Sequence, residues 1–102
     1  MTRDTLLLQR YAQRRDAEAF KELTARYAGL VYGTCLRVLG NPADAEDVAQ
    51  ECFLELARKA GAIRASLPGW LHALARSRAV DLARREATRR RYEQQLGGQP
   101  IA

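Results

Sequence analysis

Apolar residues recur at three- and four-residue steps along most of this chain, and no segment alternates as a β-strand does. The pattern breaks only at Gly40-Asn41-Pro42, around Gly61, at Pro68-Gly69 and at Gly97-Gly98. We predict helices over about 3–13, 16–39, 42–60 and from about Pro68 to Gln95, with the segment GAIRASLPG as a loop before the last of them. The spacing therefore indicates an all-α fold, a compact bundle of about four helices with a long C-terminal basic helix.

Local signals support these boundaries. Asp16, Asn41 and Ser66 stand where helix N-caps are expected, and Pro42 suits a first helical turn. Gly29 and Gly33 lie inside the second predicted helix, where each costs about 1 kcal/mol relative to alanine. We interpret these glycines as positions that permit another helix to approach closely.

Charge is segregated along this chain, which has a net charge of +5 and 15 arginines among its 17 basic residues. Residues 42–57 contain five acidic residues and no basic one, whereas residues 76–91 contain seven arginines beside Asp81 and Glu86. An acidic helix favours a basic protein partner, and an arginine-rich helix favours nucleic acid. The pattern predicts an adaptor with two binding faces, an acidic helix for a basic protein and a basic helix for nucleic acid. Asp81 lies among the arginines, and we predict that it has a structural role and pairs with Arg37, Arg78 or Arg85.

The sequence lacks the motifs of common catalytic sites. The sequence has no glycine-rich phosphate loop and no Cys-x-x-Cys pair, and His72 is its only histidine. Asp44, Asp47 and Glu51 share one helix face but lack convergent partners for a metal ion. We predict a protein that is not an enzyme and that has no cofactor and no metal site.

The cysteines and the hydropathy of the chain indicate in which cellular compartment the protein is expected. Cys35 and Cys52 each fall in an apolar helical pattern, which we interpret as a pair of reduced core thiols in a cytoplasmic protein. No apolar run approaches the ~18 residues of a membrane-spanning helix, so we expect no membrane partner.

Three motifs resemble region 2 of the sigma-70 family of bacterial transcription initiation factors, and in particular its extracytoplasmic-function (ECF) type. DAEDVAQECFLELAR at 44–58 and LPGWLHALARSRAVDLARR at 67–85 carry the resemblance, and the preceding residues also fit, so that it covers about 5–91. The first motif, DVAQE at 47–51, resembles the Asp-x-x-Gln-Glu signature of the segment that binds core polymerase. The other two, WL…A at 70–75 and ARSRAVDLARR at 75–85, resemble the promoter-reading helix of the family.

The resemblance implies two partners. In the family, the helix with the Asp-x-x-Gln-Glu signature docks on the clamp helices of the largest subunit of core RNA polymerase. This assigns polymerase binding to Asp47, Gln50 and Glu51, with Asp44 and Leu54 as neighbours. Carboxylates there can accept charge-assisted hydrogen bonds from arginine. An anti-sigma factor that covers either face is a further partner.

The second implied partner is promoter DNA, at the non-template strand of the −10 element. The loop that takes a flipped base in the family corresponds to AIRASL at 62–67, with Arg64 and Ser66. Trp70 has two readings, as a neighbour of that pocket or as a core residue that packs on the second helix. The DNA-facing helix assigns further contacts, some of them less specific phosphate contacts, to Arg76, Ser77, Arg78, Arg84, Arg85, Arg89 and Arg90.

The chain departs from the family pattern in two respects. Ser77 stands where the family often has asparagine, so the −10 preference does not follow from the family. These 102 residues also contain no match to region 4, the helix-turn-helix module that reads the −35 element, so we expect either an excised domain or a longer protein of which the rest is not included. We expect residues 1–96 to form the region 2 domain and residues 97–102 to be a linker or the start of a connection to region 4.

Two other classes remain open at this point. A general helical DNA-binding module would need the basic helix but not the acidic one, so neutral substitutions at Asp47, Gln50 and Glu51 would leave its function intact. A protein-interaction domain not tied to polymerase would use its arginines for solubility only, and would show no salt-dependent binding to DNA.

Overall fold

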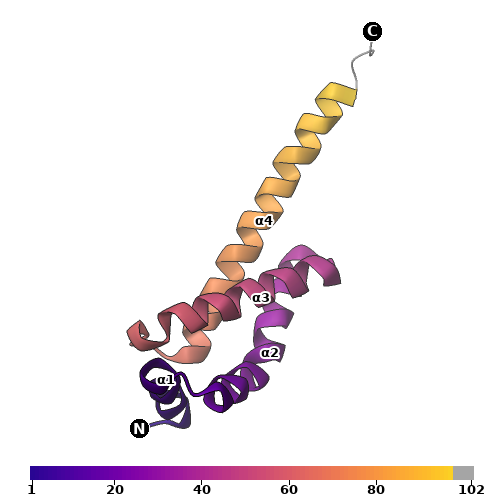
Figure 1. Cartoon of the computed structure of the whole chain (residues 1–102). Coiled ribbons are helices and arrows are strands. Elements are labelled where there is room, and N and C mark those ends of the chain that lie inside the picture. The colour runs from indigo at the N-terminus through magenta and orange to yellow at the C-terminus, as the bar shows by residue number, and fades with distance from the viewer. Residues whose placement is uncertain (98–102) are drawn as a thin grey trace.

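Four α-helices make up almost the whole of the structure, a computed structural model that describes residues 1–97 (Figure 1). They are α1 (Arg3–Arg14), α2 (Ala17–Leu39), α3 (Pro42–Lys59) and α4 (Leu67–Gly97), with a short 3-10 helix η1 (Ala60–Ala62) after α3. No strand occurs in these residues, so the all-α prediction is confirmed. The predicted linker over 97–102 begins in the last turn of α4, and its other residues lie outside those described.

The predicted caps explain most of the boundaries. The side chain of Asp16 accepts hydrogen bonds from the backbone N–H groups of Glu18 and Ala19, and that of Asn41 accepts one from Asp44. Gly40 ends α2 in the left-handed region at φ 68°. Ser66 precedes α4, but its backbone carbonyl, not its hydroxyl, accepts the bond from Trp70 N–H.

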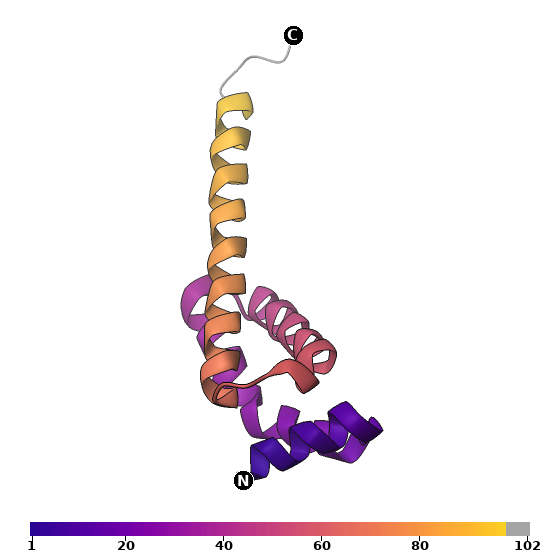
Figure 2. The ribbon, with the colours of Figure 1, turned by 90° about the vertical axis from the view of Figure 1, so that its left-hand side faces the viewer.

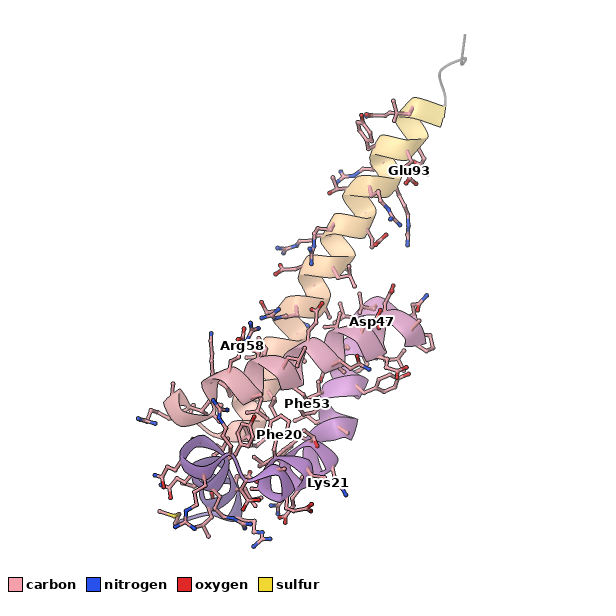
Figure 3. The ribbon with its side chains drawn as sticks, viewed as in Figure 1. Phe20, Lys21, Asp47, Phe53, Arg58 and Glu93 are labelled. Carbon is pink, nitrogen blue, oxygen red and sulfur yellow. The ribbon has the colours of Figure 1, made fainter. Side chains whose placement is uncertain are left out.

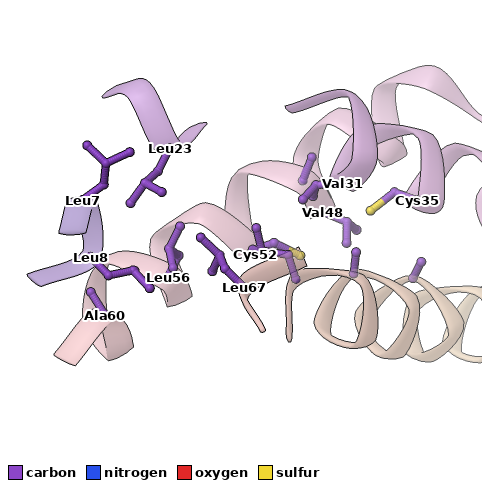
Figure 4. Packing of buried hydrophobic residues seen from close by; sticks show 14 of the residues in the cluster. Leu7, Leu8, Leu23, Val31, Cys35, Val48, Cys52, Leu56, Ala60 and Leu67 are labelled. Carbon is purple, nitrogen blue, oxygen red and sulfur yellow. The ribbon is translucent and has the colours of Figure 1, made fainter. Parts of the chain in front are cut away.

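The core lies along α2, which packs against each of the other three α-helices. Leu7, Leu23, Leu56 and Leu71 are its largest fully buried side chains, and Figure 4 shows the first three among their neighbours. The prediction that Cys35 and Cys52 are core thiols is confirmed, since both are fully buried.

Burial also determines the chemistry of the two thiols. It raises the pKa of Cys35 above its ordinary value, and burial with Cys35 nearby raises the pKa of Cys52 to about 12. Both thiols are therefore neutral at physiological pH and poor nucleophiles.

The second half of α4 leaves the bundle. Figures 1 and 2 show it continuing past the ends of the other helices with nothing packed against it. Between Arg84 and Gly97, every residue except the half-buried Glu86 is exposed, including Tyr92 and Leu96. The apolar pattern ends at Leu82, which explains why the remaining turns find no core to join.

The interpretation of the α2 glycines is wrong for this fold. A Cβ placed on Gly29 would meet no atom within 4 Å, and one on Gly33 would meet only the side chain of Arg37, from the same helix. No helix in residues 1–97 uses these glycines for close approach.

Gly29→Ala should therefore stabilise the protein. We expect the free energy of unfolding to rise by about 1 kcal/mol, because alanine loses less backbone entropy in a helix and meets no clash here. Urea denaturation followed by circular dichroism measures the change. Gly40→Ala is the matched control, since the positive φ of Gly40 should make that substitution destabilising by about 1 kcal/mol. A lower urea midpoint for Gly29→Ala would contradict the prediction.

Candidate protein and nucleic-acid interfaces

The outer side of α3 carries a surface with one apolar residue among acidic and amide groups. Asp47, Gln50, Glu51 and Leu54 are all exposed there, and we call these four residues the acidic face. Leu54 is 64% exposed, although leucine is usually buried. The residues on the opposite side of α3, Ala45, Val48, Cys52 and Leu56, are buried. Asp44, at the first turn, is half-buried.

An exposed leucine beside carboxylates suits binding of a partner protein. The leucine can lose water-accessible apolar surface on binding, while the carboxylates set orientation and association rate with a basic partner. The structure thus brings Asp47, Gln50, Glu51 and Leu54, the residues that the family resemblance groups, together on one exposed helix face.

One ion-pair cluster ties α4 to α3. The Nη2 atom of Arg78 lies 2.6 Å from Oε2 of Glu55, and its Nη1 atom lies 3.9 Å from Oε2 of Glu51. Arg58 also approaches Glu55, at 3.3 Å. The Glu55 side chain is only 13% exposed and that of Arg78 33%, so both are partly withdrawn from water.

This cluster changes the interpretation of two predicted residues. Arg78 was expected among the DNA contacts, but its guanidinium holds Glu55 of a neighbouring helix, which favours a structural role. The predicted pairing of Asp81 is wrong, because none of the ion pairs within residues 1–97 includes Asp81.

Arg78→Ala should lower the free energy of unfolding by about 1–2 kcal/mol, because it leaves the partly buried Glu55 carboxylate without its closest partner. The loss should shrink when Glu55 is also changed to glutamine, since the isolated charge is then absent. Urea denaturation of the single and double variants measures both effects. Arg84→Ala removes an exposed arginine with no ion pair in the described structure and should change stability by less than about 0.5 kcal/mol. Equal effects of Arg78→Ala and Arg84→Ala would contradict the assigned role.

Most of the other predicted arginines on α4 remain available for phosphate. Arg76, Arg84, Arg85 and Arg90 are exposed, and no ion pair within residues 1–97 involves them. Ser77 is exposed as well. Arg89 differs, since it lies 2.7 Å from Glu86 and 3.7 Å from Glu93. Figure 3 shows Glu93 far out on the projecting part of α4.

The predicted loop forms one wall of a cleft. An open cleft of about 990 Å³ lies between α1 and residues 60–68, and we call it the α1 cleft. Arg64 and Ser66 line it, as do Thr5, Gln9 and Gln13 of α1. The Nη1 atom of Arg64 donates a hydrogen bond to the carbonyl of Gly61, at 2.9 Å.

The sequence did not predict that residues of α1 line this cleft. Their signal is a spacing of four, which places Thr5, Gln9 and Gln13 on one face of a helix whose other exposed side chains are mostly charged or apolar. That spacing marks a neutral polar stripe, but nothing in it indicates that the stripe faces the 60–68 segment.

Trp70 is half-buried and packs against the hydrophobic core. The structure therefore supports the core reading of this residue. It does not line the α1 cleft.

Two kinds of site are not found. Residues 1–97 contain no group of three or more His, Cys, Asp or Glu side chains placed to hold a metal ion. Within the same residues, no helix combines the length and the apolar character that crossing a bilayer requires.

Comparisons with known proteins match the part of the chain that carries the acidic face, the 60–68 segment and most of α4. The family model described as Sigma-70 region 2 matches residues 23–89, from α2 to the projecting part of α4. The chain is 36% identical over 104 residues to "ECF RNA polymerase sigma factor SigK" of Mycobacterium sp. (strain KMS), covering 99% of this chain and 54% of that protein. It is 32% identical over 73 residues to "ECF RNA polymerase sigma factor SigW" of Bacillus subtilis (strain 168), covering 70% of this chain and 39% of that protein.

The chain thus spans about half the length, or less, of these curated relatives. No solved structure gives a significant match.

Proposed function

Because the chain belongs to the sigma-70 family, as a region 2 of the ECF type, we propose that it binds core RNA polymerase and recognises and helps to melt the −10 element of promoters. In this proposal residues 1–96 form the region 2 domain. The role is one of binding, performed in the cytoplasm, and it requires no catalytic residue.

One observation carries the polymerase half of the proposal. The acidic face presents Leu54 64% exposed among Asp47, Gln50 and Glu51, on a helix with no basic residue between 42 and 57. The partner that we propose is the pair of clamp helices of the polymerase largest subunit. Basic side chains on those helices would meet the carboxylates of the acidic face, and apolar ones would cover Leu54.

The DNA half rests on the exposed side chains of α4 and of the 60–68 segment. Arg76, Arg84, Arg85 and Arg90 would hold phosphates of the non-template strand, and Ser77 would lie at base edges. Arg89 would be a weaker contact, because Glu86 and Glu93 already compete for its guanidinium. Arg64 and Ser66 would act at the α1 cleft. We no longer assign a DNA contact to Arg78.

The two faces also suggest how such a protein could be silenced. An anti-sigma factor that covers the acidic face would exclude polymerase, and one that covers α4 would exclude DNA. The acidic face is the simpler target, because a basic helix could bind it in place of the clamp helices.

The proposal is tested by measuring two affinities of the chain. One is for a recombinant two-helix fragment of the polymerase clamp, and the other is for single-stranded DNA of about 12 nucleotides, a length within the usual site sizes. Both should bind, and log K for DNA should fall with log salt concentration at a slope near −3, because contact with about four phosphates releases the counterions condensed on them.

Each failure points to a different alternative. DNA binding without fragment binding would leave a general helical DNA-binding module. Fragment binding without salt-dependent DNA binding would leave a protein-interaction domain.

A further inference from the structure

We propose that two copies of this chain form a dimer, in which the projecting part of α4 of each copy packs on the acidic face of the other. The contact surface on α4 is a set of exposed residues that lie within about 100° of one another around the helix, at about 100° per residue. We call this set the outer stripe: Arg85, Thr88, Arg89, Tyr92 and Leu96. The contact follows from these two surfaces alone and does not depend on the proposed function.

Exposed apolar side chains are concentrated on the two surfaces. Within residues 1–97 five large hydrophobic side chains are exposed, and three of them are Leu54, Tyr92 and Leu96. Tyr92 is 62% exposed and Leu96 51%, and their spacing of four places them next to each other on α4. Single exposed apolar residues are common on protein surfaces. Here, however, they lie on two helix faces that can cover each other.

The two surfaces also match in charge and in spacing. The acidic face places its carboxylates at 47 and 51, its amide at 50 and its leucine at 54. The outer stripe places arginines at 85 and 89, a hydroxyl at 88 and a tyrosine at 92, which are the same relative positions. Helices that pack parallel and in register therefore bring a carboxylate opposite an arginine twice and Leu54 opposite Tyr92 once. Complementary charge of this kind fixes orientation and register.

The charged groups of both surfaces are available to a partner. Asp47 and Arg85 form no ion pair within residues 1–97. Glu51 is held only by Arg78, at 3.9 Å. Arg89 pairs with glutamates of its own helix, and such exposed pairs are weak enough for a carboxylate of another copy to replace them.

The outer stripe cannot reach the acidic face of its own chain. Helix α4 is continuous from Leu67 to Gly97, and its first half packs in the bundle against α2 and α3. Figures 1 and 2 show its later turns leading away from the bundle, so a contact with α3 of the same chain would require the helix to break. A second copy supplies the same two surfaces, and a symmetric dimer contains the contact twice.

The expected dimer is weak and sensitive to salt. Each contact consists of one helix face on another, which is small compared with the interfaces of stable dimers. Part of the attraction comes from exposed charges, which dissolved salt screens. The gain for the outer turns of α4 is a partner helix, which they do not have within residues 1–97 of the monomer.

Dimerisation would have a consequence for the proposed function. Each copy would cover the acidic face of the other, where we propose that polymerase binds, and would engage Arg85, one of the proposed phosphate contacts. The dimer would then be an inactive reserve, which either polymerase or DNA disperses by binding one of the two surfaces.

The test is sedimentation equilibrium of the purified chain, freed of nucleic acid so that DNA cannot bridge two copies. At low salt the average mass should rise from 11.4 kDa toward twice that value as the protein concentration increases. Raising the salt from about 50 to about 500 mM should increase the Kd of the dimer at least about 10-fold, because the Debye length falls from about 14 to about 4 Å.

Two variants with reversed charge identify the surfaces. Arg85→Glu/Thr88→Glu makes the outer stripe acidic. Asp47→Arg/Gln50→Arg makes the acidic face basic. Each variant alone should remain monomeric, since like charges would meet in its dimer. An equal mixture of the two should form dimers again, because both contacts of a mixed pair join opposite charges.

Net charge does not explain such a rescue. The first variant lowers the net charge of +5 by three and the second raises it by three, so both molecules stay positive. Ala87→Glu/Arg91→Glu is the matched control, since it makes the same charge change at exposed positions of α4 outside the outer stripe. It should still form dimers. Unchanged circular dichroism shows that all three variants are folded.

Three outcomes would overturn the inference. The first is a mass of 11.4 kDa at every protein concentration in low salt. The second is a mixture of the two variants that stays monomeric. The third is loss of dimers in Ala87→Glu/Arg91→Glu as complete as in Arg85→Glu/Thr88→Glu. These measurements contain no polymerase and no DNA, so their failure leaves the proposed function standing, and failure of either proposed partner to bind leaves the dimer standing.

Discussion

Leu71→Ala should lower the free energy of unfolding by about 3 kcal/mol, within the 2–5 kcal/mol that such substitutions cost in protein cores. Leu71 is fully buried where the first half of α4 enters the bundle. Its truncation removes apolar contacts and leaves a cavity, because the surrounding helices relax only in part. A small domain has about 5–15 kcal/mol of stability in total, so this one change should shift the urea midpoint strongly.

Leu54→Ala is the matched control for this loss. It removes the same atoms from a side chain that is 64% exposed, and it should change the free energy of unfolding by less than about 0.5 kcal/mol. The same variant should weaken binding to the clamp-helix fragment if Leu54 is covered there. Equal destabilisation by the two substitutions would mean that the core does not include Leu71 as described.

Asp47→Ala/Gln50→Ala should raise the Kd for the clamp-helix fragment about 30-fold or more, equivalent to about 2 kcal/mol. Both side chains are exposed and face away from the core, so the substitutions remove hydrogen-bonding groups from the proposed interface and none from the fold. Isothermal titration calorimetry with wild type and variant measures the difference. Affinity for single-stranded DNA should change little.

The control has to account for charge as well as for the lost groups. Glu93→Ala/Gln94→Ala also removes one carboxylate and one amide, but from the exposed outer part of α4, and should leave fragment binding unaltered. If both double variants lose affinity equally, the attraction to the fragment depends on net charge and not on the acidic face. If neither loses affinity, the polymerase contact lies elsewhere on the chain.

Helix positions could be predicted because their causes are local. Asp16 and Asn41 act within their own first turns, and Gly40 ends α2 through its own backbone conformation. The buried side of α3 followed from three- and four-residue spacing alone. The exposed positions of Asp47 and Glu51 were predictable for the same reason, because they lie opposite the buried side. Leu54 was placed beside them only by the family resemblance, since spacing alone does not explain why an apolar residue is 64% exposed.

The features that were not predicted depend on contacts between distant residues. Arg78 shares a helix face with other arginines, and the sequence does not show that Glu55, 23 residues earlier, lies within 2.6 Å of it. The α1 cleft joins residues near the N-terminus to residues 60–68 and exists only once both are packed. Gly29 is a residue type common where two helices pack closely, but no atom in residues 1–97 lies within 4 Å of the position that a Cβ would take there.

The shape of α4 has a consequence for cooperativity. The described fold is 64 Å long and about 22 Å wide, because the outer turns of α4 extend from the bundle alone. The outer turns, residues 84–97, pack against no other helix, and an isolated helix as short as this is marginally stable in water. Amide hydrogens of the outer turns should exchange with solvent through local fraying, whereas those near Leu71 should exchange only when the whole bundle opens. In the DNA complex, phosphate contacts to Arg84, Arg85 and Arg90 would offset the entropy lost when these turns are held helical. DNA binding should therefore slow amide hydrogen exchange most at that end of the molecule.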